Sequence, residues 1–377
     1  MKSEIDIRNE FENTFGREAT LAVSAPGRVN LIGEHTDYNR GWVLPMAVER
    51  RIWAAGRCTS GNKIKLSSAN MPEPVEIQGH ITRTGAWIDY PLGVIWALRE
   101  NGCRVPGVEI RFHGDLPIGG GLSSSAAIEV ATASLLTNLC ALPISNKEIA
   151  RLCQLAENQF VGMNCGAMDQ MASALAEEGK VLYIDCADFT YDLIPLNVGD
   201  YKVVVVDSGI KRELAGSEYN RRRKECEMAA RELGVKSLRD LSVDDINKIE
   251  KLPDPIGRRA RHVVTENDRV RRAVKYLSKS KLEEFGVLMN ASHSSLRHDY
   301  EVSISELDFL VDACNEIDGV LGARLTGAGF GGCIVALAHS DSIPAIEKNV
   351  LEPYCKKFGE RPSLMTSKPA KGVRIED

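Results

Sequence analysis

One stretch of this chain constrains its fold more than any other: Asp115 to Ala127 reads Asp-Leu-Pro-Ile-Gly-Gly-Gly-Leu-Ser-Ser-Ser-Ala-Ala. Residues 108–112 before it alternate apolar and polar side chains as a strand does, and residues 126–139 after it have the apolar spacing of a helix. A glycine-rich turn at the start of a helix presents free backbone N–H groups and the positive end of the helix dipole. The pattern therefore predicts a strand, an anion-binding loop and a helix in direct succession.

This loop lacks the lysine of a Walker loop, so it is not an ordinary P-loop. A simpler interpretation is a glycine-rich turn with a serine N-cap. Three adjacent glycines are entropically costly, however, and we therefore favour phosphate binding. The serine hydroxyls can cap the helix or reach a phosphate or a metal ion.

Length and composition indicate an ordinary globular enzyme of two domains or one large unit. The chain has 377 residues, of which 44% are hydrophobic and 26% charged. Its formal net charge of −5 argues against nucleic acid or an anionic membrane as the main partner. No apolar run has the length of a transmembrane helix, and the charged N-terminal residues do not resemble a signal peptide. We therefore expect a cytoplasmic enzyme.

The cysteines, the basic stretches and the late glycines of this chain do not by themselves indicate a metal, nucleic-acid or dinucleotide site. The ten cysteines are scattered without a Cys-x-x-Cys pair, which gives no support to a structural zinc site. The basic stretches 221–224 and 258–272 are interleaved with acidic residues, so they indicate solvated helix faces. The glycines of 327–332 match a dinucleotide-binding pattern, but they lead into a strand-like run, which indicates a tight turn close to another element or a ligand.

The predicted elements divide near residue 198. The first part, 1–198, is rich in predicted strands and contains the glycine-serine loop and its helix. The second part, 199–377, begins with a valine-rich strand at 201–207 and continues with long charged helices. We therefore expect an N-terminal domain over 1–198 and a C-terminal domain over 199–377.

A polar segment, Gly27 to Asn39, follows an apolar strand-like run. Its end carries four adjacent hydrogen-bonding side chains, Glu34, His35, Thr36 and Asp37. Carboxylates beside an imidazole suit a polyhydroxylated ligand, because each sugar hydroxyl needs an acceptor as well as a donor. Arg28 lies inside the strand, where a charge is costly unless it is paired, so it is expected to serve a phosphate or orient a carboxylate. A polar turn with one surface arginine explains the spacing about as well.

Two acidic residues, Asp169 and Glu157, do not indicate a function by themselves. Asp169 stands at the start of a predicted helix, and Glu157 lies twelve residues earlier. Taken alone, Asp169 is an N-cap and Glu157 a solvent-facing glutamate.

Together these segments resemble the galactokinase family of the GHMP small-molecule kinases, which also include homoserine, mevalonate and phosphomevalonate kinases. Gly27 to Asn39 looks like the segment specific to galactokinases. Pro117 to Ala127 and Leu325 to Gly332 resemble the phosphate loop and the late glycine-rich segment of the wider family. Residues 216–223 and 259–267 also match, so the resemblance runs from about Ala25 to Ala338.

The resemblance implies a two-domain α/β (α+β) fold. An N-terminal domain like ribosomal protein domain 2 would pack against a C-terminal α+β domain, with the active site in the cleft between them. The implied activity is ATP-dependent phosphorylation of the C1 hydroxyl of D-galactose to galactose 1-phosphate, with Mg²⁺ as cofactor. The implied partners are ATP and a monosaccharide, without nucleic acid or membrane, and the protein would be a monomer or a weak homo-oligomer.

The resemblance also implies roles for individual residues. Asp169 would be the base that takes the proton from the anomeric hydroxyl. Arg28 would keep Asp169 ionised and offset charge on the moving phosphoryl group. Ser125 and Glu157 would hold Mg²⁺. The sugar-binding residues would be Glu34, His35, Thr36, Asp37, Gly166 and Tyr219. The ATP-binding residues would be Ser68, Trp87, Gly119, Gly120, Gly121, Leu122, Ser123, Ser124 and Ser125.

Two alternatives stay open. Arg40, close to the sugar-binding segment, could pair a carboxylate, which raises a related sugar-1-kinase acting on galacturonate or arabinose. A non-catalytic galactose sensor of the same fold would have a shortened serine-alanine part of the phosphate loop. Residues 123–127 are complete in this chain, so the sensor is the weaker alternative.

Overall fold

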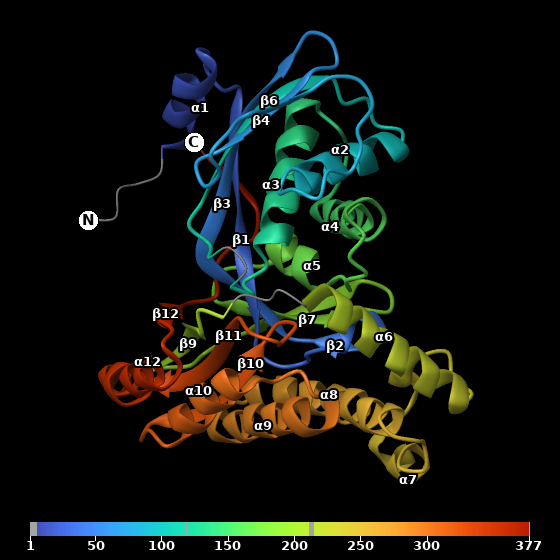
Figure 1. The fold of residues 1–377 in the computed structure, drawn as a ribbon, viewed down its shortest axis with the longest axis vertical. Helices are drawn as coiled ribbons and strands as arrows, with labels where there is room; N and C mark the ends of the chain where they lie inside the picture. Colours follow the sequence, from blue (N-terminus) through green and yellow to red (C-terminus); the bar gives the residue numbers. More distant parts are fainter. Residues whose placement is uncertain (1–5, 118–119, 211–214, 377) are drawn as a thin grey trace.

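A computed structural model describes residues 6–117, 120–210 and 215–376, with the side chains of 215–217 excepted, and the strands of these residues form three sheets (Figure 1). The largest has the strand order β13-β1-β3-β6-β4-β5. Its strands are β1 (Leu21–Asn30), β3 (Pro45–Thr59), β4 (Ile64–Ser68), β5 (Val75–Ile77), β6 (Gly107–Gly114) and β13 (Arg374–Glu376). Only the β4–β6 pair is parallel among these described strands.

Helices cover both faces of this sheet, which explains why nearly every residue of β1 is buried. On one face lies α1 (Ile7–Phe15), whose Ile7 and Phe11 pack on Ala22 and Ala55. On the other face lie α2 (Asp89–Glu100), α3 (Ser124–Leu139), α4 (Asn146–Leu155) and α5 (Met168–Leu175) (Figure 1). Helix α3 is apolar around most of its circumference because it packs between β1, β3 and the other three helices.

A three-stranded sheet, β2-β7-β8, lies between this layer and the rest of the chain (Figure 1). Its strands are β2 (Trp42–Val43), β7 (Lys180–Asp185) and β8 (Thr190–Pro195). The third sheet has the order β10-β11-β9-β12 and is antiparallel throughout. Its strands are β9 (Tyr201–Asp207), β10 (Val320–Thr326), β11 (Cys333–His339) and β12 (Ser363–Ser367).

The helices of the C-terminal part gather beside this third sheet (Figure 1). They are α6 (Ala215–Glu232), α7 (Ile246–Ile249), α8 (Ile256–Leu277), α9 (Leu282–Ser295), α10 (Ser305–Asn315), α11 (Ile343–Ile346) and α12 (Glu352–Phe358). Shorter helical turns are η1 (Asp37–Asn39), η2 (Ala156–Val161), η3 (Leu238–Asp240), η4 (Val243–Asp245), η5 (Leu296–Tyr300), η6 (Ser340–Ser342) and η7 (Glu347–Leu351). Among the residues described, no helix has the length and apolarity to span a membrane.

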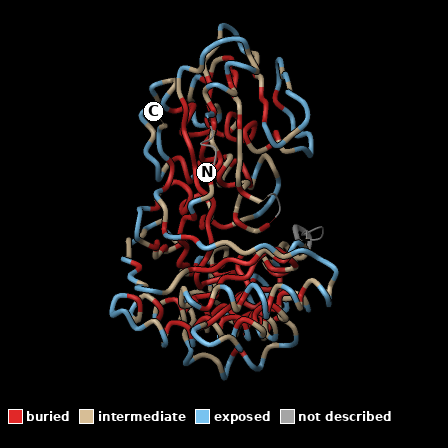
Figure 2. Tube along the Cα trace, turned by 90° about the vertical axis from the view of Figure 1, so that its left-hand side faces the viewer, coloured by how far each residue is buried: buried red, intermediate tan, exposed pale blue. Residues whose placement is uncertain are grey.

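The third sheet separates two hydrophobic cores, as the buried trace in Figure 2 illustrates. In β9, Val203 and Val205 belong to the core of the N-terminal layer, whereas Val204 and Val206 belong to the core under the C-terminal helices. Strand β11 alternates in the same way. Because successive strand residues point to opposite faces, a continuous apolar run is what a sheet buried on both sides requires.

The elements predicted around the glycine-serine loop are confirmed, since residues 108–112 lie in β6 and residues 126–139 lie in α3, and so is the valine-rich strand at 201–207, which is β9. The turn predicted at the late glycines is confirmed as well. A side-chain carbon at Gly329 would lie 2.2 Å from the Val302 carbonyl oxygen, and one at Gly331 would lie 2.8 Å from that of Ile210. Strands β5, β8, β12 and β13 were not predicted, because they are short or lie at sheet edges.

Candidate active site

A cavity of about 810 Å³ opens between the N-terminal layer and the C-terminal part. Most of its lining comes from residues before 170, and Tyr219, Gly327 and Ala328 line it from the other side. The predicted site residues that line it are Arg28, Glu34, His35, Asp37, Ser68, Trp87, Gly121, Ser123, Ser124, Ser125, Glu157, Gly166, Asp169 and Tyr219. The cavity therefore gathers residues from the Gly27–Asn39 segment, the glycine-serine loop, residues 216–223 and the late glycine-rich segment, but none from 259–267.

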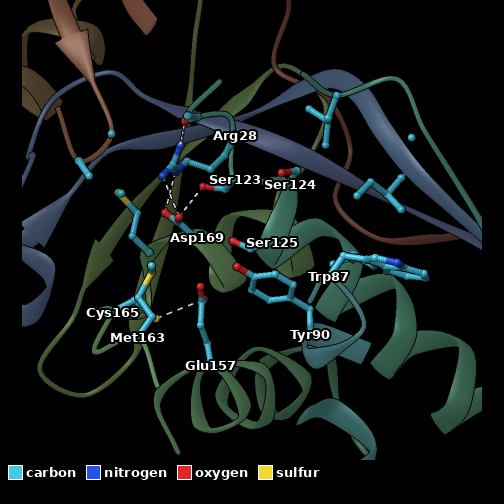
Figure 3. Close-up of a pocket in the computed structure, with 18 of the residues that line it drawn as sticks. Arg28, Trp87, Tyr90, Ser123, Ser124, Ser125, Glu157, Met163, Cys165 and Asp169 are labelled. Atoms are coloured by element: carbon cyan, nitrogen blue, oxygen red, sulfur yellow. Dashed lines mark hydrogen bonds and ion pairs between the residues drawn. The ribbon is translucent and has the colours of Figure 1, made fainter. Parts of the chain in front are cut away.

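Arg28 and Asp169 form a bidentate ion pair in this cavity (Figure 3). Arg28 Nε donates to Asp169 Oδ1 at 2.6 Å, and Nη2 donates to Oδ2 at 2.8 Å. The register of β1 against β3 shifts between Pro26 and Arg28, and such a bulge re-aims the side chain that follows it. Gly27 is needed there, because a side-chain carbon would lie 2.5 Å from the carbonyl oxygen of Leu122.

The glycine-serine loop joins this ion pair to the start of α3. Arg28 Nη1 donates to the carbonyl oxygen of Gly121 at 2.8 Å, and the Ser123 hydroxyl donates to the Asp169 carboxylate. Gly121 has a φ of 83° and Ser123 a φ of 56°, both in the left-handed region that a tight turn requires. The loop thus places the start of α3 against the cavity, with Ser124 and Ser125 facing it (Figure 3).

Two of the described residues predicted to bind ATP, Gly120 and Leu122, do not line the cavity. Gly120 lies against Asp207 and Pro117, and its carbonyl oxygen accepts a hydrogen bond from Cys333 Sγ at 2.7 Å. The Leu122 side chain is buried in the core, so any contact with a nucleotide has to come from its backbone. Gly119 lies outside the described residues.

Ser125 and Glu157 present hard oxygen ligands next to the loop. Both side chains line the cavity, and the Glu157 carboxylate is buried and accepts from Gln170 Nε2 at 2.6 Å. Burial, followed by the charge of Asp169, raises the pKa of Glu157 to about 7. No cluster of three or more histidine, cysteine or acidic side chains suited to a metal occurs in the part of the chain described. A hydroxyl and one carboxylate fit Mg²⁺, which takes few protein ligands and completes its shell with water and phosphate oxygens.

The sugar-binding segment turns into the cavity after β1. The buried Glu34 carboxylate accepts hydrogen bonds from Asn30 Nδ2 and from Gly327 N, the latter at 2.6 Å. Burial, followed by the charge of Asp169, raises the pKa of Asp37 to about 7. A side-chain carbon at Gly166 would lie 2.1 Å from Asp37 Oδ2, so only glycine leaves room for this carboxylate.

His35 and Tyr219 complete this end of the cavity, and Thr36 does not. The rings of His35 and Tyr219 lie 5.6 Å apart between centroids. Thr36 is fully buried, and its hydroxyl lies 2.8 Å from the Gly33 carbonyl oxygen and 2.7 Å from that of Trp42. These contacts give the Thr36 hydroxyl a structural role in the turn, and its sugar contact stays a prediction. Arg40 is exposed and absent from the lining, so its side chain is not placed to meet a ligand's carboxylate.

The cavity extends from the Arg28–Asp169 pair toward Trp87 (Figure 3). Ser68 at the end of β4 and Trp87 before α2 line it, and the Trp87 ring meets Phe112 edge-on at 6.0 Å. Tyr90, Asn70 and Met71 also line the cavity but were not predicted. Tyr90 follows Trp87 by three residues at the start of a helix, and this spacing was the only signal available from the sequence.

Two buried charged residues that were not predicted, Arg324 and Glu266, hydrogen-bond the backbone of the sugar-binding segment. Arg324 in β10 is fully buried, with Nη1 donating to the Asn30 carbonyl oxygen at 3.0 Å and lying 3.6 Å from Glu34 Oε1. Glu266 in α8 accepts from Gly33 N at 2.8 Å. A charged residue inside an apolar strand was a usable signal for Arg324, as it was for Arg28.

Comparison with known proteins agrees with the geometry of the site. Residues 9–58 match the galactokinase galactose-binding signature, 89–177 the N-terminal domain of GHMP kinases and 273–354 their C-terminal domain. The chain is 42% identical to a Roseiflexus galactokinase over 381 residues, covering 99% of this chain and 97% of the relative. It is 40% identical to the Thermosipho africanus galactokinase, covering 94% of this chain and 99% of the relative.

A solved structure gives the same result for the fold. Lactococcus lactis galactokinase, crystallised with galactose, superposes with a TM-score of 0.94 at 34% identity, covering 97% of this chain and 98% of the other. The two-domain α/β fold that the resemblance implied is thereby confirmed. The chain belongs to the galactokinase family of the GHMP kinases.

Proposed function

We propose that this protein transfers the γ-phosphoryl group of ATP to the C1 hydroxyl of D-galactose, giving galactose 1-phosphate and ADP. The observation that carries the proposal is the Arg28–Asp169–Ser123 arrangement at the start of α3, inside one cavity with Glu34 and Asp37. It combines an anion-binding helix start, a carboxylate base and acceptors for sugar hydroxyls. The family membership supports the same reaction.

In this mechanism Asp169 accepts the proton of the anomeric hydroxyl as the oxygen attacks phosphorus. Arg28 holds the Asp169 carboxylate in one orientation through two hydrogen bonds and offsets negative charge near the transferred group. The free N–H groups at the start of α3 face the phosphates, where they and the helix dipole favour negative charge. This arrangement supplies the charge neutralisation that a Walker lysine supplies in other loops.

Ser125 and Glu157 are the residues that would hold Mg²⁺ with the phosphates. The ion neutralises charge on the β- and γ-phosphate oxygens when it is bound. The side chains of Glu34, Asp37, His35 and Tyr219, with the backbone of Gly166, would enclose the sugar. Ser68 and Trp87 would lie beside the nucleoside.

The direct test is ADP release with a panel of sugars. Galactose, arabinose, galacturonate and N-acetylgalactosamine are each supplied with ATP and Mg²⁺, and ³¹P NMR identifies the phosphorylated position. We expect galactose to be turned over fastest and to carry phosphate at C1. Faster turnover of a competitor would reassign the substrate, and galactose binding without ADP release would indicate a sensor.

The position of Arg40 and the complete loop weigh against the two alternatives. A galacturonate kinase needs a cation facing C6, and Arg40 is exposed and does not line the cavity. A sensor would lack part of the serine-alanine run that here begins α3. We further propose a cytoplasmic enzyme that acts as a monomer or weak homo-oligomer, without nucleic acid or membrane, and sedimentation velocity tests the oligomeric state.

A further inference from the structure

A chain of hydrogen bonds runs from His35 at the sugar end of the cavity into the C-terminal part. His35 Nδ1 lies 2.8 Å from the Tyr38 hydroxyl, which lies 2.7 Å from the Tyr300 hydroxyl. The Tyr300 hydroxyl lies 3.1 Å from Cys226 Sγ. His35 lines the cavity, whereas Tyr38, Tyr300 and Cys226 do not.

A backbone carbonyl fixes the direction of this chain. His35 Nε2 lies 3.1 Å from the Ala328 carbonyl oxygen, which can only accept, so Nε2 carries the proton. The His35 ring is buried, which favours the neutral imidazole, and Nδ1 is then an acceptor. Tyr38 therefore donates to His35, Tyr300 donates to Tyr38, and Cys226 donates to Tyr300.

Tyr300, in the middle of the chain, is held in place by a charged neighbour and by ring contacts. Arg222 Nε donates to the Tyr300 carbonyl oxygen at 2.7 Å. The Tyr300 ring lies between His35 and His262, at centroid distances of 4.7 and 4.5 Å. Burial raises the pKa of Tyr38 and of Tyr300 well above the usual value, so both hydroxyls keep their protons. The chain is thus a fixed array of donors.

We propose that Tyr38, Tyr300 and Cys226 are positioning residues that hold His35 in its Nε2–H tautomer and in one ring orientation, and thereby set the enzyme's affinity for its sugar. The inference deepens the proposed function and rests on it, because it assigns His35 to the sugar end of the cavity. The three residues come from η1, η5 and α6, so the C-terminal part determines a property of the N-terminal sugar-binding segment.

Steady-state kinetics test the inference through a split between KM and kcat. Tyr300→Phe removes the donor to Tyr38 and keeps the ring, so the KM for galactose is expected to rise about fivefold to tenfold. The kcat and the KM for ATP are expected to stay within about twofold, because Arg28, Asp169 and the loop are not in the chain. Cys226→Ala is expected to act in the same direction with a smaller effect, and Cys226→Ser, which keeps a donor, to restore the affinity.

The ring nitrogens of His35, observed by ¹H–¹⁵N NMR, give a readout independent of activity. We expect the Nε2–H tautomer in the wild-type protein, where the Ala328 carbonyl oxygen accepts from it, and a displaced Nδ1 resonance in Tyr300→Phe, because the Tyr38 hydroxyl is then no longer held as a donor to Nδ1. Tyr354→Phe is the matched control, because Tyr354 is also buried and donates to a carbonyl oxygen, that of Ser208 at 2.9 Å. It should change neither the spectrum nor the KM.

Several outcomes would overturn the inference. These are an Nδ1–H or doubly protonated His35 in the wild-type protein, or an unchanged Nδ1 resonance and KM in Tyr300→Phe. If Tyr300→Phe does not fold, Cys226→Ala decides, since an unchanged KM for galactose there also contradicts the chain. A wild-type protein that releases no ADP with galactose would refute the proposed function instead, and the NMR result would still stand.

Discussion

At the scale of single residues, the site depends on how buried charges are paired. The side chain of Arg28 is 5% exposed and that of Asp169 27% exposed, so the acid is open to the cavity while its partner is not. Two parallel hydrogen bonds fix the plane of the carboxylate, and the Ser123 hydroxyl adds a third. A base held this way can meet a sugar hydroxyl without reorienting.

Replacing the base tests this arrangement. Asp169→Asn keeps the shape and one hydrogen-bond acceptor but removes the group that takes the proton, so kcat is expected to fall about 10²- to 10⁴-fold. Binding of ATP and galactose, measured by calorimetry, is expected to persist. Asp185→Asn is a control, since Asp185 also forms a bidentate pair with an arginine, Arg239, but does not line the cavity. Near-normal turnover in Asp169→Asn would remove Asp169 from the role of base.

Asp37 gives the site a dependence on pH. Its pKa is raised from 3.8 to about 7 by burial and then by Asp169, so the carboxylate proposed to accept from a sugar hydroxyl is protonated in acid. The KM for galactose is therefore expected to rise by about tenfold per pH unit below pH 7 and to level off above it. In Asp37→Asn the KM is high at every pH, and this slope should disappear.

The raised pKa of Asp37 also predicts how the stability of the protein changes with pH. A pKa raised in the folded state means that the folded protein holds the proton more tightly, so the contribution to stability is complete below about pH 4 and is lost as the pH rises through about 7. Between these limits the free energy of unfolding of the ligand-free wild type should fall relative to that of Asp37→Asn. Urea denaturation at several pH values measures the difference, and parallel pH curves for the two proteins would contradict the assignment.

At the scale of elements, the sugar-binding segment belongs to the N-terminal layer but is held by β10 and α8. Arg324 in β10 lies 3.6 Å from Glu34 and 3.9 Å from Glu266, and all three side chains are buried. Burial raises the pKa of Glu266, but Arg269, His262 and Arg324 outweigh it and bring that pKa down to about 2. Both carboxylates bind backbone N–H groups of glycines, Gly33 and Gly327, at the two turns beside the cavity.

Removing this arginine should destabilise the whole protein. Arg324→Met leaves two buried carboxylates without their common cation, and the free energy of unfolding is expected to fall by about 3–5 kcal/mol. Arg297→Met is the matched control, because Arg297 also pairs with two acids, Asp308 and Asp312, but is 37% exposed. The free energy of unfolding of Arg297→Met should fall by less than about 1 kcal/mol. Equal losses in the two variants, measured by urea denaturation, would show that burial of the Arg324 cluster is unimportant.

The elements that could be predicted carry a pattern in their own residues, whereas the elements that were missed depend on pairing with distant parts of the chain. Helix α3 and strand β9 carry continuous patterns, and the glycine-serine loop and the Gly27–Asn39 segment carry motifs, so all four were found. Strand β13 has three residues, and its place is set by pairing with β1, which no local pattern encodes. A motif does not tell which of four adjacent polar side chains faces the cavity, and the Thr36 hydroxyl contacts two backbone carbonyl oxygens while Thr36 does not line the cavity. Tyr300 and Cys226 lay outside every motif that we used to define the site.

At the scale of the whole molecule, the chain leaves the N-terminal sheet and finally returns to it. We propose domains over 1–198 and 199–377, with the C-terminal residues crossing back, because β12 pairs with β9 whereas β13 pairs with β1. Buried Arg51 in β3 fixes this crossing. Its Nη1 donates to the Lys371 carbonyl oxygen at 2.8 Å, and its Nη2 donates to that of Gly372 at 2.7 Å.

A chain that ends at Lys371 tests whether this crossing stabilises the N-terminal layer. It loses the β13–β1 pairing and one carbonyl acceptor of Arg51, so the free energy of unfolding is expected to fall by about 2–4 kcal/mol. The kcat of the folded fraction should be unchanged, because none of the described residues 372–376 lines the cavity. Arg51→Met in the full chain removes the same contact from the other side, so the two changes combined should cost clearly less than their sum. Additive losses in the free energy of unfolding would mean that β13 stabilises the protein independently of Arg51. No loss on truncation would mean that β13 does not stabilise the N-terminal layer.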